Sequence, residues 1–498
     1  MHLSPDTAEN LFRLAPEIVL CFSGILVMLA EPFVATAHKK ALGWLGFLGA
    51  LAALAAVRVA SLHPGDAYGG LMRVDSFSVF VHYVVVGAAA LAILGSIDYL
   101  EQERLQRGEY YALILFATAG MGVLAGAGEL VTAFIGLEMS SIASYILAGF
   151  RRNVEKSNEA SLKYFLLGSF ATAFFLYGIA MIYGATGTTR LEAIAASPAT
   201  ALPAPLVLLG LGMIFVGLGF KVVAAPFQIY APDVYEGAPT PVTALLASGP
   251  KAATFAVMLR IFYVAFAPAG HFWFWAIWIS AALTMCIGNL AALTQTNVKR
   301  MLAYSSIAHA GYILVAFAAS SDFGVAAVLF YLAAYAVMKL GAFTVVTHLG
   351  GVGERRLEIS DYAGLGTRQP VLAACFGLFL LSLLGLPATG GFLGKFYAFQ
   401  AALDSAHGAS AHAVHYSRAL VWLVVLAALN SAVGAYYYLR VIVAMYFREP
   451  QKEWENLRVA PAVVLALAVT ALGTLYLGLL PSRVMEFAAR AAFSLHSP

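Results

Sequence analysis

The sequence predicts an all-α polytopic membrane protein with about 14 transmembrane helices, and three observations support this prediction. Of its 498 residues, 61% are apolar and only 11% are charged, whereas a soluble domain carries about 25% charged residues. The apolar residues fall into long runs, and a run of about 20 residues crosses a bilayer. The polar breaks between runs are short, so little chain remains for a domain outside the membrane. This composition excludes a soluble enzyme, a disordered chain and a nucleic-acid-binding protein.

The apolar runs define the expected spans in order. They lie near residues 16–35, 41–62, 77–98, 110–127, 129–149, 160–184, 204–230, 240–267, 272–293, 299–319, 323–349, 371–403, 419–447 and 459–481. The connections around Gly128 and Ser320–Asp322 are short, so we expect tight turns there. Asp6 and Glu9 precede the first span where a signal peptide carries basic residues, so we expect this span to be retained.

Basic residues in the loops predict the orientation of the chain, because cytoplasmic loops are enriched in lysine and arginine. If the spans alternate in direction, fifteen basic residues share one side and six share the other. The larger group comprises Lys39, Lys40, Arg104, Arg107, Arg151, Arg152, Lys156, Lys299, Arg300, Arg355, Arg356, Arg368, Arg448, Lys452 and Arg458. The smaller group comprises Arg13, Arg73, Arg190, Arg418, Arg483 and Arg490. We therefore expect both termini to lie outside the cytoplasm.

Other cations fall inside the spans, where charge is costly. Arg58, Arg260 and Arg440 lie one to two turns from a span end, so we expect these side chains to reach the headgroups. Deeper ionisable groups are Glu138, Lys221, Lys251, Lys339 and Lys395. An ionisable group at that depth costs several kcal/mol and faces a partner or a hydrated path.

Simple ion pairing does not account for four central lysines and one central carboxylate. An unpaired ammonium in an apolar interior gives up its proton more readily than one in water, as a proton relay requires. His309 lies near the centre of its span and is a further candidate relay group. The alternatives are buried ion pairs that only fix helix packing and, for His309, a hydrogen-bonded core residue.

Two of these lysines lie beside predicted helix breaks, in spans 7 and 12. Pro226 follows Lys221, and the stretch Gly385–Gly391, which contains Pro387, precedes Lys395. Proline removes a backbone donor and clashes with the preceding turn. A break at membrane depth is tolerated only where it is buried in protein or lines a cavity. Broken helices with charge at the midplane are typical of transporters.

The spacing of ionisable groups predicts an internal repeat. The separations are 171 residues from Glu138 to His309, 176 from Lys163 to Lys339 and 174 from Lys221 to Lys395. Spans 4–8 then correspond to spans 9–13, and five spans per copy invert the second copy relative to the first. We expect an N-terminal three-helix segment over residues 1–109, antiporter-like repeats over 110–267 and 268–447, and a C-terminal helix with a short tail over 448–498.

Motifs for other chemistry are missing from the sequence. Cys21, Cys286 and Cys375 each stand alone in an apolar run, which supports neither a disulfide framework nor a metal site. No glycine-rich nucleotide motif follows a strand, and no catalytic triad stands out. We therefore expect no metal and no redox cofactor on this chain.

Three long segments resemble motifs of the antiporter-like subunits of respiratory complex I. They are GFKVVAAPFQIYAPDVYEGAPTPVT at 219–243, RMLAYSSIAH at 300–309 and GLPATGGFLGKF at 385–396. The resemblance extends over nearly the whole chain. Within the family it is greatest to the N-type subunits of bacterial NADH-quinone oxidoreductase, which are related to mitochondrial NADH dehydrogenase subunit 2. Both the DVYEGAPTP stretch and Lys395, where M-type subunits carry glutamate, favour the N type.

The resemblance implies roles for individual residues. Glu138 and Lys221 match the family's Glu/Lys pair, Lys251 the connecting lysine, and Lys395 the terminal lysine. His309 is a link in the central hydrophilic axis, whereas the role of Lys339 rests mainly on its burial. The implied function is proton translocation, in which a charge change in a neighbouring subunit draws Glu138 away from Lys221 and releases a proton towards Lys395.

The resemblance also implies the setting. The expected partners are the bilayer and other membrane subunits of complex I, both antiporter-like and small, in a bacterial inner membrane. NADH, FMN, iron–sulfur clusters and quinone belong to partner subunits, so the chain is part of a translocase without redox chemistry of its own. Two alternatives remain: a subunit of a multi-subunit Na⁺/H⁺ antiporter, and a structural membrane subunit without a proton path.

Overall fold

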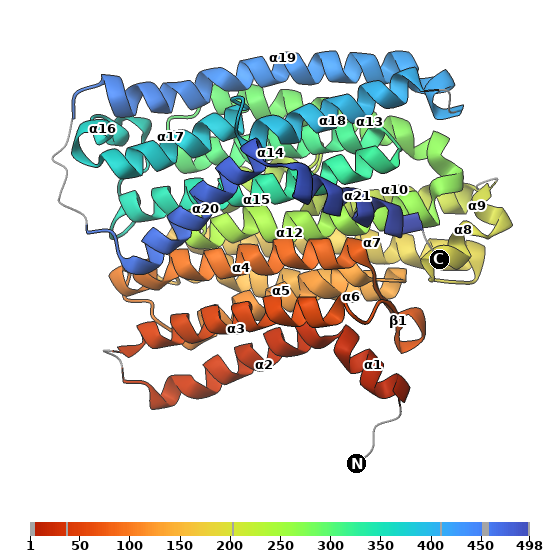
Figure 1. Cartoon of the computed structure of the whole chain (residues 1–498), viewed down its shortest axis with the longest axis horizontal. Helices are drawn as coiled ribbons and strands as arrows, with labels where there is room; N and C mark the ends of the chain where they lie inside the picture. Colours follow the sequence, from red (N-terminus) through yellow and green to blue (C-terminus); the bar gives the residue numbers. More distant parts are fainter. Residues whose placement is uncertain (1–4, 36–37, 202–203, 409–410, 451–457, 497–498) are drawn as a thin grey trace.

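The computed structural model describes residues 5–35, 38–201, 204–408, 411–450 and 458–496. Twelve of the described helices are long and apolar enough to cross a membrane, and two shorter apolar helices, Pro205–Lys221 and Pro370–Leu384, begin the two broken spans. The predicted all-α membrane protein with about 14 spans is therefore confirmed. The helices run side by side, and the described ends of α1 (Pro5–Arg13) and α21 (Ser482–His496) lie at the same end of the bundle (Figure 1).

The remaining elements follow the predicted order. The N-terminal segment holds α2 (Ala15–Ala30), α3 (Lys40–Ala60), the hairpin of β1 (Gly65–Ala67) and β2 (Met72–Val74), and α4 (Ser76–Gln102). Next come α5 (Gly108–Gly126), α6 (Leu130–Ala148), α7 (Glu155–Thr186), α8 (Leu191–Ala195), α9 (Pro198–Ala201), α10 (Pro205–Lys221), α11 (Ala231–Gly237) and α12 (Thr240–Arg260). Then follow α13 (Gly270–Leu293), α14 (Val298–Ala318), α15 (Asp322–Gly350), α16 (Leu365–Arg368), α17 (Pro370–Leu384), α18 (Gly390–His407), α19 (Ala411–Phe447) and α20 (Pro461–Leu479).

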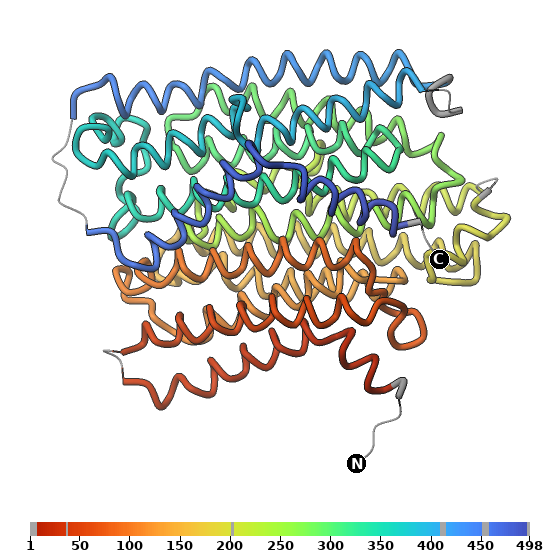
Figure 2. Tube along the Cα trace, viewed as in Figure 1, coloured from red at the N-terminus to blue at the C-terminus, as the bar shows by residue number. Residues whose placement is uncertain are grey.

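The packing of the helices repeats between the two halves. In the first half, α5 packs on α6, α7 packs on α10 and α11, and α12 packs on α5. The matching pairs in the second half are α13 with α14, α15 with α17 and α18, and α19 with α13. Each half contains one broken span, and Figure 2 shows the path of the chain turning between α17 and α18. Five spans per half make the second copy inverted relative to the first.

The residue pairs used to find this repeat do not all occupy equivalent positions. Lys163 lies 8 residues after the start of α7, whereas Lys339 lies 17 residues after the start of α15. Lys221 ends the helix before its break, whereas Lys395 lies in the helix after its break. The two residues of each pair therefore occupy different positions relative to their helix ends, although their separations along the chain are similar.

The break between α10 and α11 is stabilised by side chains from the other half of the molecule. Thr284 on α13 accepts a 2.7 Å hydrogen bond from the backbone N–H of Ala225, and Ser280 donates one of 2.7 Å to the carbonyl of Ala225. Both hydroxyl side chains are buried. They satisfy backbone groups that the interrupted helix leaves free, as an apolar surrounding requires.

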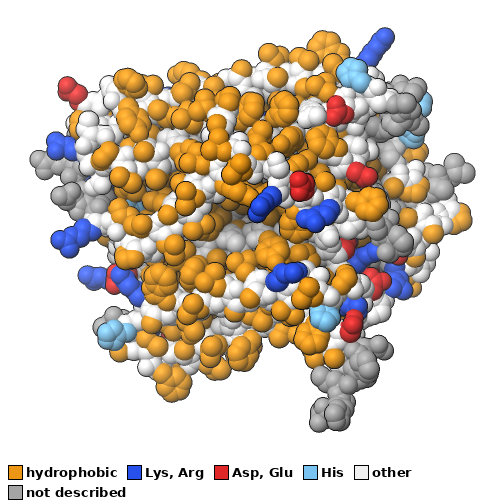
Figure 3. Space-filling model, viewed as in Figure 1, with side chains coloured by type: hydrophobic (Ala, Val, Ile, Leu, Met, Phe, Trp, Pro, Cys, Tyr) orange, Lys and Arg blue, Asp and Glu red, His pale blue; other side chains and the backbone are white. Residues whose placement is uncertain are grey.

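On the face shown in Figure 3, charged side chains lie at the two ends of the bundle with a broad hydrophobic band between them, and a smaller charged group lies within this band. Lys452, one of the predicted loop cations, lies outside the described residues. Arg260 does not reach the headgroups as expected: it is buried and its guanidinium contacts the Asp75 carboxylate at 2.7 and 2.9 Å. Arg440 instead donates to the carbonyl of Leu293 at 3.2 Å. Pairing inside the protein replaces the expected contact with headgroups for these two residues.

Candidate functional site

Lys221 is the last residue of α10, directly before the first helix break, and it is buried. The ammonium of Lys221 lies 5.0 Å from the ring centroid of Tyr145 and 4.9 Å from that of Tyr164. The ammonium has no hydrogen-bond partner among the described residues, and Lys221 is only 7% exposed. Cation–π contacts of this kind stabilise an ammonium group without neutralising it.

Glu138 and Lys221 interact electrostatically, but no ion pair within 4.0 Å joins them among the described residues. Glu138 lies on α6 two turns before Tyr145, so both residues share a face of that helix. The Oε1 atom of Glu138 is buried and accepts no hydrogen bond from a described residue. The expected pair is therefore close enough to interact through space, with the tyrosine rings rather than the carboxylate in contact with the ammonium.

Lys251 connects the two repeats. It lies on α12, whose span is buried throughout, and is 1% exposed. Its ammonium donates a 2.8 Å hydrogen bond to the backbone carbonyl of Ser306 on α14 and lies 5.3 Å from the ring centroid of Tyr335 on α15. The first repeat thus places a lysine against two helices of the second.

A hydrogen-bonded string links Lys339 to His309. The ammonium of Lys339 donates to the Ser305 hydroxyl at 3.1 Å, and this hydroxyl lies 2.6 Å from that of Tyr438. The Tyr438 hydroxyl lies 3.2 Å from Nε2 of His309, and Nδ1 of His309 lies 2.8 Å from the Tyr331 hydroxyl. All five residues are buried. A string of groups that both donate and accept can pass a proton from one to the next.

Lys395 stands beside the second helix break. Its ammonium donates 2.8 Å hydrogen bonds to the carbonyl of Leu384, the last residue of α17, and to the Ser431 hydroxyl on α19. A cation is favourable at a helix C-terminus, where carbonyl groups lack partners. The ammonium also lies 4.8 Å from the ring centroid of Tyr312, whose ring is 5.8 Å from that of His309.

The sequence analysis missed the tyrosines that join these groups. Tyr331, Tyr335 and Lys339 are spaced by four residues on α15, so they share one face of an otherwise apolar helix. This four-residue spacing could have been recognised in the sequence as a polar face of that helix. The contribution of Tyr438, from a helix more than 100 residues away, depends on how the helices pack and had no local signal.

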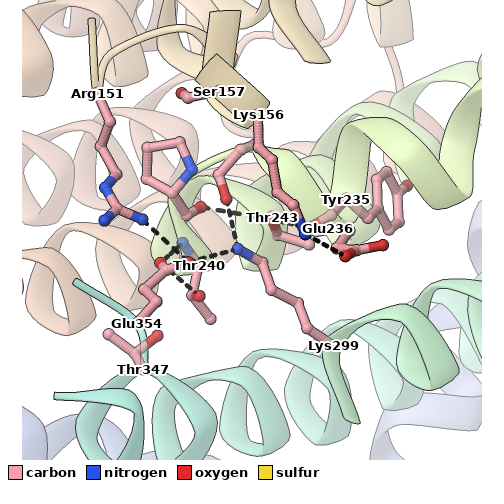
Figure 4. Close-up of polar contacts among 12 residues, drawn as sticks. Arg151, Lys156, Ser157, Tyr235, Glu236, Thr240, Thr243, Lys299, Thr347 and Glu354 are labelled. Carbon is pink, nitrogen blue, oxygen red and sulfur yellow. Dashed lines mark hydrogen bonds and ion pairs between the residues drawn. The ribbon is translucent and has the colours of Figure 1, made fainter. Parts of the chain in front are cut away.

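A second buried polar cluster, centred on Glu354, was also missed (Figure 4). The Glu354 carboxylate contacts the Lys299 ammonium at 2.9 Å and Arg151 at 3.3 Å. It also accepts hydrogen bonds from the backbone N–H of Thr240 at 2.8 Å and from the Tyr99 hydroxyl at 2.9 Å. Burial alone would raise the pKa of the Glu354 carboxyl. The positive charges of Lys299 and Arg151 together lower this pKa by more than burial raises it, so it lies below the usual 4.5. Glu354 therefore ties helices of both repeats together at one end of the bundle.

Comparison with known proteins agrees with this architecture. Residues 127–420 match the family described as NADH:quinone oxidoreductase/Mrp antiporter, TM. The chain is 50% identical to NADH-quinone oxidoreductase subunit N 1 of Solibacter usitatus, over 99% of this chain and 100% of that protein. It is 37% identical, with a TM-score of 0.78, to a chain of respiratory complex I from Thermus thermophilus, over 95% and 99% of the two chains.

A chain of the Mrp complex from Dietzia sp. DQ12-45-1b has the same fold, with a TM-score of 0.83 over 99% of this chain and 98% of that one. Its sequence identity is only 21%, so this likeness concerns the fold alone. The relatives of higher identity match this chain over nearly their full length, and they are named NADH-quinone oxidoreductase subunit N. The chain therefore belongs to the NADH:quinone oxidoreductase/Mrp antiporter family and, within it, to subunit N of NADH-quinone oxidoreductase.

Proposed function

We propose that this chain translocates protons as a membrane subunit of an NADH-quinone oxidoreductase. The observation that carries the proposal is the string from Lys339 through Ser305 and Tyr438 to His309, buried between helices of the second repeat. An apolar interior accommodates several ionisable groups only where they serve a path or a partner. The names of the most similar relatives support the same function.

The proposed sequence of events begins at Lys221. Glu138 stabilises the protonated lysine through space, and a charge change in a neighbouring subunit weakens this interaction. Two unit charges 4 Å apart interact by about 4 kcal/mol at an effective dielectric constant of about 20. Over a longer separation the effect on the proton affinity of Lys221 is smaller, because the interaction energy falls with distance.

The released proton then crosses to the second repeat. Lys251 gives its own proton to the second repeat, whose α14 it contacts, and as the neutral amine it then accepts the proton released from Lys221. Lys339 and His309 form the central part of the path, and Lys395 beside the second break is the last group. Water must bridge from Lys221 to Lys251, from Lys251 to Lys339 and from His309 to Lys395, since no direct hydrogen bond joins any of these pairs among the described residues.

The setting is part of the same proposal. The chain lies in the inner membrane of a bacterium. Both of its termini lie outside the cytoplasm, as the distribution of loop cations favours. The repeats extend over 110–267 and 268–447, between the segments 1–109 and 448–498. NADH, FMN, iron–sulfur clusters and quinone bind to other subunits, and this chain contacts the neighbouring antiporter-like and small membrane subunits.

The test is NADH-driven proton uptake by inverted membrane vesicles containing the assembled complex. Lys221→Ala is compared with the wild type at equal complex content, and Lys156→Ala serves as the control because its side chain is 73% exposed. We expect Lys221→Ala to abolish uptake and coupled NADH oxidation and Lys156→Ala to change neither.

Two other outcomes would contradict the proposal. Unchanged uptake in Lys221→Ala vesicles would make Lys221 a structural charge and favour a structural subunit. Uptake that requires sodium and continues without NADH would favour a Na⁺/H⁺ antiporter.

A further inference from the structure

Two adjoining hollows lie on the face formed by α4, α15, α20 and α21. The first is a groove of about 410 Å³, and the second is a cavity of about 350 Å³ where α3 ends and α4 begins. Tyr83 and Phe487 line both, so the groove and the cavity share a wall and meet there. The two hollows differ in chemistry: the groove is almost wholly apolar, whereas two arginines and several polar groups line the cavity.

The cavity presents positive charge that the protein does not neutralise. Arg58 and Arg490 line it and are exposed, and neither forms an ion pair with a described residue. Among the described residues, the Arg58 guanidinium donates to the Ser61 hydroxyl at 3.0 Å, and that of Arg490 lies 5.9 Å from the ring centroid of Phe487. Asp75 also lines the cavity, but its carboxylate is occupied by Arg260. An anion in this cavity would therefore meet two guanidinium groups that have no ionic partner among the described residues.

The groove is open along its apolar wall. A methyl group added at Gly87 on α4 would meet no atom within 4 Å. Around Gly87 the wall is built from Phe80, Val84 and Leu91 on α4, with Ala333 and Val337 on α15. Figure 3 shows basic and acidic side chains over α21 and a basic one near the end of α3, surrounded by hydrophobic surface. Charge in such a surrounding is costly unless an opposite charge meets it.

We propose that the two hollows bind one anionic phospholipid. Its phosphate lies between Arg58 and Arg490, and one acyl chain follows the groove past Gly87. Basic pockets between membrane helices bind anionic headgroups, and arginine is well suited to phosphate because it offers paired donors. A free phosphate ion would leave the adjoining apolar groove empty, so a lipid accounts for both hollows. This inference does not depend on the proposed proton path.

The test uses the assembled complex in detergent with two photoactivatable lipids. One is phosphatidylglycerol and the other phosphatidylcholine, each with a diazirine in one acyl chain, and labelled peptides are identified by mass spectrometry. We expect phosphatidylglycerol to label the peptides of α4 and α21 about tenfold more than phosphatidylcholine, because each arginine adds to the attraction.

Three variants separate the contributions of charge and groove. The double variant Arg58→Gln with Arg490→Gln should reduce phosphatidylglycerol labelling to the phosphatidylcholine level. Gly87→Leu should reduce labelling by both lipids, because it fills the groove, and it decides the matter if the double variant does not assemble. Arg483→Gln is the matched control, since Arg483 is exposed on the same helix but lines neither hollow.

Other results would overturn the proposal. Equal labelling of the wild type by the two lipids would exclude a specific anionic lipid. The same conclusion would follow if neither the double arginine variant nor Gly87→Leu changed the labelling. If neither lipid labels α21 while a chemical cross-linker joins it to another subunit, the face is a subunit contact.

Discussion

The ammonium of Lys251 donates a 2.8 Å hydrogen bond to the backbone carbonyl of Ser306, across the boundary between the two repeats. Tyr335 reinforces this junction, because its hydroxyl donates to the Ser306 side chain at 2.8 Å and its ring lies beside the Lys251 ammonium. A proton that passes from Lys221 to the second repeat would meet a titratable group of the first repeat at this contact. The junction is therefore the most direct place to interrupt the proposed path.

Lys251→Met should block transfer between the repeats while preserving the packing of α12. Methionine nearly matches the lysine stem in length and removes the ammonium, so we expect proton uptake per NADH oxidised to fall at least about tenfold, the size of effect that a lost proton-transfer group produces. Vesicle uptake measurements at equal complex content provide the comparison. Lys156→Met is the control. If the Lys251→Met vesicles took up protons as fast as the wild type, protons would not cross between the repeats at Lys251.

Tyr438→Phe should slow proton movement without stopping it. The Tyr438 hydroxyl bridges Ser305 and His309, and removing it breaks the string while a water can take its place. The loss of a hydrogen-bonded link of about 1 kcal/mol corresponds to a roughly fivefold lower rate. Tyr436→Phe is the matched control, because Tyr436 lies on the same helix but is 60% exposed. Equal rates for both variants would remove Tyr438 from the path.

Glu138→Gln should uncouple proton uptake from NADH oxidation, because it removes the charge that acts on Lys221. We expect uptake to fall at least about tenfold, whereas Glu138→Asp, which keeps the charge, should retain most of it. The ratio of protons taken up to NADH oxidised measures the effect. An unchanged ratio in Glu138→Gln would refute charge coupling through this carboxylate.

The sequence was sufficient to predict features that depend on local composition. The spans follow from apolar runs, and the breaks follow from Pro226 and the Gly385–Gly391 stretch. Contacts between distant segments could not be predicted, because they depend on how the helices pack. Arg260 and Asp75, for example, are 185 residues apart and form a buried pair. No local pattern distinguishes that arginine from one that reaches the headgroups.

The string of hydroxyl groups had the same limitation. Ser305 and Tyr438 are 133 residues apart, and each alone reads as an ordinary polar residue in an apolar helix. The lysines were predictable as candidates because buried charge is costly wherever it lies. Which of them are connected, and through which hydroxyl groups, became visible only in the structure.

Glu354→Gln should destabilise the contact between the repeats in a pH-dependent manner. The variant leaves the buried Lys299 without its carboxylate partner and Arg151 with only Glu103 at 3.3 Å among the described residues, and breaking a buried pair in this way costs about 3–5 kcal/mol. The pKa of Glu354 is held below 4.5 in the folded protein, so this stabilisation is present above the unfolded pKa and is lost only as the pH falls through the lower, folded value. Thermal unfolding of the purified complex should therefore show a constant difference between variant and wild type from pH 7 to about 5. Glu155→Gln is the control, since Glu155 is exposed and should change stability by less than about 0.5 kcal/mol. A difference that already vanishes above pH 5 would mean that Lys299 and Arg151 do not keep this carboxylate ionised.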